Sequence, residues 1–398
     1  MKKLMILAAI AALTLASCAK IENSAPTKAT AVPIGFSKYT PRALTKADAT
    51  YASSTTLVNG KVFGVYSYAT ANGTAFTTSA TGTNFMNGVE VTYGTGGDSD
   101  ETKNTYSPLR YWPSGDSPDW LTFWAYYPVQ ANNGITYTVP DGSNGVGTYA
   151  FAANATAATM VDFMVSDVVN DKIYGTATGD HVAVNGVVPL TFRHQLTKVQ
   201  FKFKTTSLTN TTVKLVEAKL HNIKTTGTLT TEYASGSTST SWGLESTKGF
   251  ASTPIVYDIT FNGANPEDGT ETSYITLGTD ALPAAVGTEN PATDVFLMLP
   301  QKMIPKNEDN TQYLEIKWDV ITTDGTTEVT THNTKKLYFK NDLKNGDDPA
   351  ATGYAAADID WNKNDFITYT VTIGPKPIQF TATVADWGTE QNGYFNVQ

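Results

Sequence analysis

The sequence predicts an all-β protein built from two tandem β-sandwich domains. Charged residues make up only 16% of the 398 residues, whereas about 25% is usual in soluble domains. Short segments rich in Val, Thr, Tyr and Phe alternate between apolar and polar positions, as strands do when one face is buried. Clusters of Gly, Asn, Asp and Pro separate these segments and mark turns. Beyond the first residues, no stretch carries the 3.6-residue periodicity of a helix.

The chain begins with an export signal that ends at its only cysteine. Lys2 and Lys3 precede an apolar stretch over residues 4–15, and Leu-Ala-Ser-Cys follows at residues 15–18. This arrangement is typical of a secretory signal, and the apolar stretch is too short to span a membrane. Its last four residues resemble the lipobox of bacterial lipoproteins, in which the cysteine sulfur receives a diacylglycerol. We therefore expect residues 1–17 to be removed and Cys18 to be lipidated; the alternative is a secreted protein with a stray cysteine.

The first expected strand follows a polar tether. Val32, Ile34 and Phe36 alternate with smaller residues, which predicts a short strand despite a proline between them. The chain then places Arg42 and Lys46 among small and polar neighbours, a pattern typical of an exposed loop. The tether, this strand and the loop together form a segment over residues 18–46.

The remaining expected strands run to the C-terminal region. They lie, in chain order, at residues 61–68, 121–127, 162–165, 187–204, 213–223, 273–277, 295–299, 313–321, 335–339 and 366–373. The stretch 174–186 is small, polar and rich in glycine, so we expect a domain boundary near residue 180. The two domains would then cover residues 47–180 and 181–398.

The C-terminal tail, about residues 376–398, is unusually apolar. Its apolar residues include Ile378, Phe380, Val384, Trp387, Tyr394, Phe395 and Val397. Because an apolar strand is rarely left in water, we expect it to pair with another strand. It either completes its own sandwich or is donated to a neighbouring subunit by strand addition.

Few residues form patterns typical of catalysis or of metal binding. The four histidines, at 181, 194, 221 and 332, have no metal-ligand spacing. The sequence contains no nucleophile elbow, phosphate-binding loop or dinucleotide fingerprint. A single cysteine argues against a cysteine-based zinc site, and a net charge of −9 argues against a nucleic-acid partner. We expect no enzyme activity, no cofactor and no metal.

Three alternatives of lower weight remain open. The acidic residues at 98–101 lie beside glycines, which favours a turn over a calcium site. Asp358 and Asp360 would project from one face of a strand, as paired carboxylates of a glycosidase would. Trp112 and Trp120 lie among aromatic residues that could stack on sugar rings, although alternating aromatic residues more often pack in a core.

Four stretches of the sequence resemble the fimbrillins, subunits of the type V pili of anaerobic Gram-negative bacteria. They are LASC at 15–18, YWP at 111–113 with LTFWAYYP at 121–128, VPLTFRHQLTKVQFKF at 188–203, and TVADWG at 383–388. The resemblance covers essentially the whole chain. It implies two transthyretin-like β-sandwiches in tandem and a lipoprotein precursor anchored in the outer membrane.

The resemblance also implies proteolytic processing. A trypsin-like protease specific for Arg or Lys would cut in the loop after the first strand. The implied bond is Arg42–Ala43, with Lys46–Ala47 as the alternative. The cut would separate the lipidated cysteine from the body of the protein.

Polymerisation is the last implication of the resemblance. Loss of the first strand, with Val32, Ile34 and Phe36, would leave an apolar groove. The C-terminal tail of another subunit would fill that groove by donor-strand exchange, and a head-to-tail contact that does not close on itself builds a filament. The resemblance implies an extracellular fimbrium supporting adhesion, with other fimbrillins and a host or bacterial surface glycan or protein as partners. A tip or anchor subunit, and a monomeric glycan-binding surface lipoprotein, remain alternatives.

Overall fold

The computed structural model gives the protein an all-β fold, which confirms the predicted fold class. It describes residues 31–39, 62–77, 82–94, 104–129, 135–141, 146–152, 160, 162–206, 208–234, 237–242, 255–258, 275–278, 282–283, 295–306, 309, 311–340, 360–374 and 379–386. All strands in these ranges fall into four sheets. Within the same ranges, no helix is long and apolar enough to cross a membrane.

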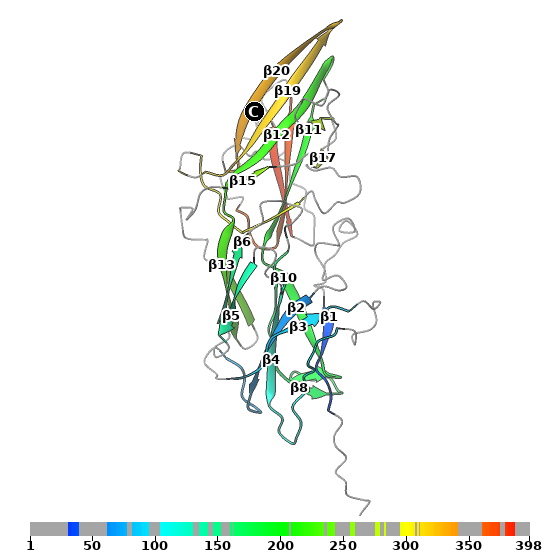
Figure 1. The fold of residues 1–398 in the computed structure, drawn as a ribbon, viewed down its shortest axis with the longest axis vertical. Coiled ribbons are helices and arrows are strands. Elements are labelled where there is room, and N and C mark those ends of the chain that lie inside the picture. Colours follow the sequence, from blue (N-terminus) through cyan, green and yellow to red (C-terminus); the bar gives the residue numbers. More distant parts are fainter. Residues whose placement is uncertain are drawn as a thin grey trace, which may run out of the picture.

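An eight-stranded sheet occupies the end of the molecule that is drawn at the bottom of Figure 1. It contains β1 (Gly35–Tyr39), β2 (Val62–Thr70), β3 (Thr83–Thr92), β4 (Trp120–Tyr127), β7 (Met164–Ser166), β8 (Val169–Gly175), β9 (Val182–Val184) and β10 (Val187–His194). Its main path runs β1-β10-β7-β4-β2-β3; off this path, β8 pairs with β4, and β9 pairs with β8. β1 is therefore an edge strand.

A four-stranded sheet packs against this first sheet. It runs β14-β13-β6-β5 and contains β5 (Ile135–Asp141), β6 (Val146–Ala152), β13 (Thr226–Ala234) and β14 (Ser237–Trp242). β2 and β4 are buried on both faces because their alternating side chains serve two cores. Phe63 and Phe123 enter the core that β1 shares, whereas Tyr68 and Trp124 enter the core against the four-stranded sheet.

Two five-stranded sheets form a sandwich in the upper half of Figure 1. One contains β11 (Thr197–Thr205), β17 (Leu282–Pro283), β18 (Val295–Met298), β21 (Asp365–Ile373) and β22 (Gln379–Asp386). The other contains β12 (Thr211–Ile223), β15 (Ile255–Asp258), β16 (Ile275–Thr276), β19 (Tyr313–Asp324) and β20 (Thr327–Tyr338). A single buried cluster joins their facing sides, with Phe201 and Tyr369 from the first sheet and Leu215 and Ile316 from the second.

The expected strand segment 187–204 contains two strands that belong to different sheets. β10 ends at His194 and β11 begins at Thr197. Between them, Gln195 N donates to the carbonyl oxygen of Phe163 over 2.9 Å, and the Leu196 carbonyl accepts from Asn364 N over 3.0 Å. The chain passes from one sheet to the other at this point. The expected domain boundary near residue 180 lies between β8 and β9, which pair with each other, so the domain division stays a prediction.

Candidate assembly site

The first strand pairs with residues 110–112 before Gly35 and with β10 from Gly35 onward. Ile34 N donates to the Arg110 carbonyl over 2.9 Å, and Trp112 N donates to the Val32 carbonyl over 3.0 Å. From Gly35 onward, β1 runs parallel to β10, and Gly35 N donates to the Gly186 carbonyl over 2.9 Å. The register continues residue by residue to the end of β1. The segment predicted as the first strand is thus paired along its length.

The side chains of this segment fill part of a core. Ile34 is 2% exposed and Phe36 is 1% exposed. The Phe36 ring lies 5.8 Å from the Tyr106 ring and 6.2 Å from the Phe123 ring, measured between centroids. Val32 is half-buried at the edge of the same core. Full burial of an isoleucine or phenylalanine side chain is worth about 1.5–3 kcal/mol, so the core holds the segment strongly.

Two side chains outside any strand reach the carbonyl oxygens of this segment. Asn104 Nδ2 donates to the Phe36 carbonyl over 2.7 Å, and the Tyr106 hydroxyl donates to the Ile34 carbonyl over 2.9 Å. Burial raises the pKa of the Tyr106 hydroxyl above its ordinary value, which keeps the donor protonated. These contacts satisfy oxygens on the side of the segment that faces away from β10. Asn104 and Tyr106 are not recognisable as site residues from the sequence, because residues 104–112 carry no strand periodicity.

The surface beneath β1 is a strand edge beside an apolar floor. Val188 and Leu190 of β10 are buried in the same core as Phe36, and Phe63 and Phe192 complete this floor. The β10 backbone over residues 187–191 is paired with β1. Removal of β1 would leave the β10 edge without a hydrogen-bonding partner and would expose these apolar side chains to water. Both changes are unfavourable in free energy.

The last described strand is also an edge strand, in another sheet. β22 pairs antiparallel with β21, from Thr372 opposite Gln379 to Asp365 opposite Asp386. Phe380 lies opposite Val371, and Val384 lies opposite Ile367. In this conformation residues 379–386 complete the sheet of their own chain. Figure 1 places β22 in the upper half of the elongated molecule and β1 in the lower half.

Several residues singled out from the sequence lie outside the described ranges. They are Cys18, Arg42, Ala43, Lys46, Ala47, Ile378, Trp387, Tyr394, Phe395 and Val397, together with Asp358 and the acidic residues at 98–101.

The aromatic residues considered for sugar stacking have structural partners. Trp112 is 5% exposed, so it offers no open ring face and this part of the glycan-binding alternative is wrong. Trp120 is half-buried and stacks on His181, with ring centroids 4.3 Å apart.

Two further side chains near the end of β4 have buried surroundings. His194 Nδ1 lies 2.6 Å from a carboxylate oxygen of Asp162. Burial raises the pKa of Tyr127, at the end of β4, to about 12.

Comparisons with known proteins give a family match and several similar solved structures. A family model described as fimbrillin-like matches residues 45–387. A fimbrial protein from Bacteroides vulgatus ATCC 8482 is 21% identical, with 89% of this chain and 99% of that chain covered and a TM-score of 0.60. A proposed cell adhesion protein from Bacteroides uniformis ATCC 8492 is 18% identical, with 90% and 98% covered and a TM-score of 0.40. No curated protein sequence matches the chain.

Proposed function

This chain belongs to the fimbrillin-like family, and from that premise we propose that it is a structural subunit of a type V fimbria that supports adhesion. Its precursor is exported as a lipoprotein, anchored in the outer membrane through Cys18. A trypsin-like protease then cuts after Arg42, or alternatively after Lys46. The trimmed body joins an extracellular fimbrium at the cell surface.

The observation that carries this proposal is the position of the first strand. β1 is an edge strand, and Phe36 in this strand and Ile34 just before it are buried in the core. A cut in residues 40–47 would break the covalent link between this segment and the body without removing any other described strand. The groove left behind would combine a free β10 edge with an apolar floor. A strand of another subunit fits such a groove by adding to the sheet edge.

The C-terminal tail of a second copy is the proposed occupant. β1 and β22 lie in opposite halves of the molecule (Figure 1), which favours a head-to-tail contact over a closed dimer. Residues 379–386 already pair with β21. Residues 387–398 can therefore cross to the next subunit without breaking that pairing, and they contribute Trp387, Tyr394, Phe395 and Val397. Several large side chains at about 1.5–3 kcal/mol each offset the cost of ordering the tail.

Limited proteolysis of the lipid-free chain, residues 19–398, tests the proposal. We expect a trypsin-like protease to create a new N-terminus at Ala43 or Ala47, identified by N-terminal sequencing. The product should form an SDS-resistant ladder on an unheated gel. The double variant Arg42→Ala, Lys46→Ala is the matched control and should stay monomeric. A clean cut that yields only monomer indicates a tip subunit or a monomeric binding protein, and no cut at either bond rejects strand exchange for this chain.

A further inference from the structure

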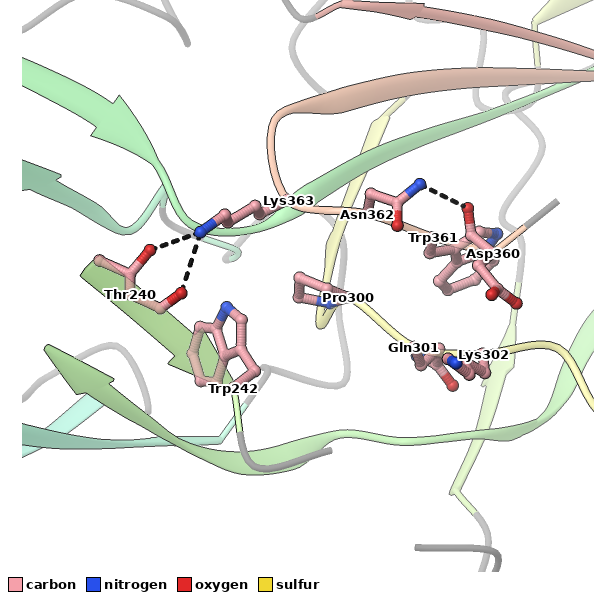
Figure 2. A pocket seen from close by; sticks show the side chains of 9 residues that line it. All are labelled: Thr240, Trp242, Pro300, Gln301, Lys302, Asp360, Trp361, Asn362 and Lys363. Carbon is pink, nitrogen blue, oxygen red and sulfur yellow. Dashed lines mark hydrogen bonds between the residues drawn. The ribbon is translucent and has the colours of Figure 1, made fainter. Parts of the chain in front are cut away.

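A cavity of about 300 Å³ opens where two of the cores approach each other. Trp242, at the end of β14, belongs to the core beside the four-stranded sheet, and Trp361, before β21, belongs to the core between the five-stranded sheets. Pro300 lies between these two rings along the cavity in Figure 2. The other side chains around the cavity are Thr240, Gln301, Lys302, Asp360, Asn362 and Lys363.

Most of the polar atoms around the cavity are engaged with the protein itself. The indole N–H of Trp242 donates to the Gln195 carbonyl over 2.7 Å, and that of Trp361 donates to the Tyr369 hydroxyl over 2.8 Å. Lys363 Nζ reaches across one side of the cavity and donates to Thr240 Oγ1 over 2.6 Å (Figure 2). The cavity therefore has fixed walls before any ligand arrives.

Two charged groups at the cavity keep capacity for a ligand. Asp360 is half-buried; its Oδ1 accepts from Met303 N over 2.9 Å, while its Oδ2 has no partner in the part of the chain that the structure describes. Lys302 is exposed, and its Nζ has no partner among those residues either. Both groups can therefore form charge-assisted hydrogen bonds with a ligand, which are stronger than hydrogen bonds between neutral groups.

The combination of groups restricts the class of ligand. An anion such as phosphate would meet the Asp360 carboxylate, and a cation would meet Lys302 and Lys363. An apolar molecule would leave the Asp360 oxygen without a donor. A sugar hydroxyl both donates and accepts, so it satisfies the carboxylate and the ammonium groups together. The volume lies at the lower end of the range for small-molecule sites, about 300–1,000 Å³, which suits one ring.

We propose that this cavity binds one neutral hexopyranose unit of a glycan. A ring seated here donates a hydroxyl to Asp360 Oδ2 and accepts from Lys302 Nζ, and its carbon atoms face Pro300. The site lies away from β1 and its groove. Sugar binding can therefore be tested independently of strand exchange. It would let the protein attach directly to a glycan.

Ligand-observed NMR on the lipid-free chain, residues 19–398, tests this inference. The probes are methyl α-D-glucoside, methyl α-D-galactoside, methyl α-D-mannoside and N-acetyl-D-glucosamine, with D-glucuronate and inorganic phosphate as charged comparisons. We expect saturation transfer to at least one neutral sugar. Asp360→Asn, which keeps an oxygen for Met303 N, and Lys302→Ala should each weaken binding about tenfold.

Lys204→Ala, on β11 and outside the cavity, is the matched control and should bind like the unaltered protein. Three results overturn the inference: no transfer to any neutral sugar, binding of glucuronate or phosphate alone, or neutral-sugar binding that survives both cavity variants.

Discussion

Trp112 donates its indole N–H to the carbonyl oxygen of Gly186 over 3.0 Å. This contact joins the two segments that flank the beginning of the first strand, since Trp112 N bonds to Val32 and the Gly186 carbonyl bonds to Gly35. Gly186 has φ of +78° in the turn that precedes β10. A Cβ at this position would lie 2.9 Å from Trp112 Nε1 and 3.1 Å from Val32 Cγ1. Both the backbone conformation and the close approach therefore require glycine here.

The substitution Gly186→Ala should consequently destabilise the protein. We expect a loss of about 2–5 kcal/mol in unfolding free energy, since left-handed strain contributes about 1–2 kcal/mol and crowding about 1–3 kcal/mol. Urea denaturation measures the change. Gly73→Ala is the matched control, because Gly73 also has φ of +78° but no atom within 4 Å of its Cβ position. Equal losses for the two variants would show that the contact with Trp112 has no energetic role.

Substitution of Phe36 should loosen the first strand after the protease has cut. Phe36→Ala removes a ring that is 1% exposed, and such a loss costs about 3–5 kcal/mol. Because the cut segment is then held only by non-covalent contacts, its release should accelerate by about a hundredfold or more. A fluorophore at the N-terminus of the lipid-free chain reports the release rate.

Phe339→Ala is the control for this experiment. Phe339 is also 1% exposed, but it lies in the core of the five-stranded sheets. It should lower overall stability similarly while leaving the release rate unchanged. A Phe36→Ala protein that releases the segment at the rate of the unaltered chain would contradict the proposed hold of this core on β1.

The strands that are predictable from the sequence are those whose burial follows a simple alternation. β21 repeats apolar residues at every second position because one of its faces packs in a core, and β12 does the same except at two register shifts, after Leu215 and after Leu220. β13 and β14 lack this pattern: Leu229 and Trp242 are buried, and most of their neighbours along the two strands are Thr and Ser. Their assignment depends on pairing between β13 and β6, which lie far apart in the chain, and no local periodicity encodes that contact.

Some residues of the candidate site are also recognisable from the sequence, and others are not. Ile34 and Phe36 are recognisable because they alternate with small residues, and Asn185-Gly186 is a turn signal that the sequence carries openly. Asn104 and Tyr106 are not recognisable, since their role is to reach the carbonyl oxygens of a segment far earlier in the chain. Such contacts become visible only when the packing of the whole domain is known.

Acidification should weaken the C-terminal sandwich through His221. Its ring stacks on Tyr313 with centroids 4.5 Å apart, and burial lowers the pKa of His221 below 6.5 despite the nearby Glu315. The unfolded chain therefore binds a proton at a higher pH than the folded chain, so stability rises with pH through this window. As pH falls from 7 to 5, this contribution is lost. Urea unfolding of the unaltered protein and of His221→Gln over this range gives the unfolding free energy at each pH. This free energy should change less steeply with pH in the variant, and equal slopes would refute the role of His221.

Two truncations should separate the structural and the polymerising parts of the C-terminal region. A chain ending at Asp386 keeps all of β22, whose eight residues pair with β21, so it should fold with nearly unchanged stability. After trimming by the protease it should remain monomeric, because it lacks the apolar residues that we propose to cross to the next subunit. A chain ending at Gly374 also loses β22, exposes the β21 edge and should be clearly less stable. Denaturation midpoints and an unheated denaturing gel provide the two measurements, and a ladder formed by the chain ending at Asp386 would assign the donor role to β22 itself.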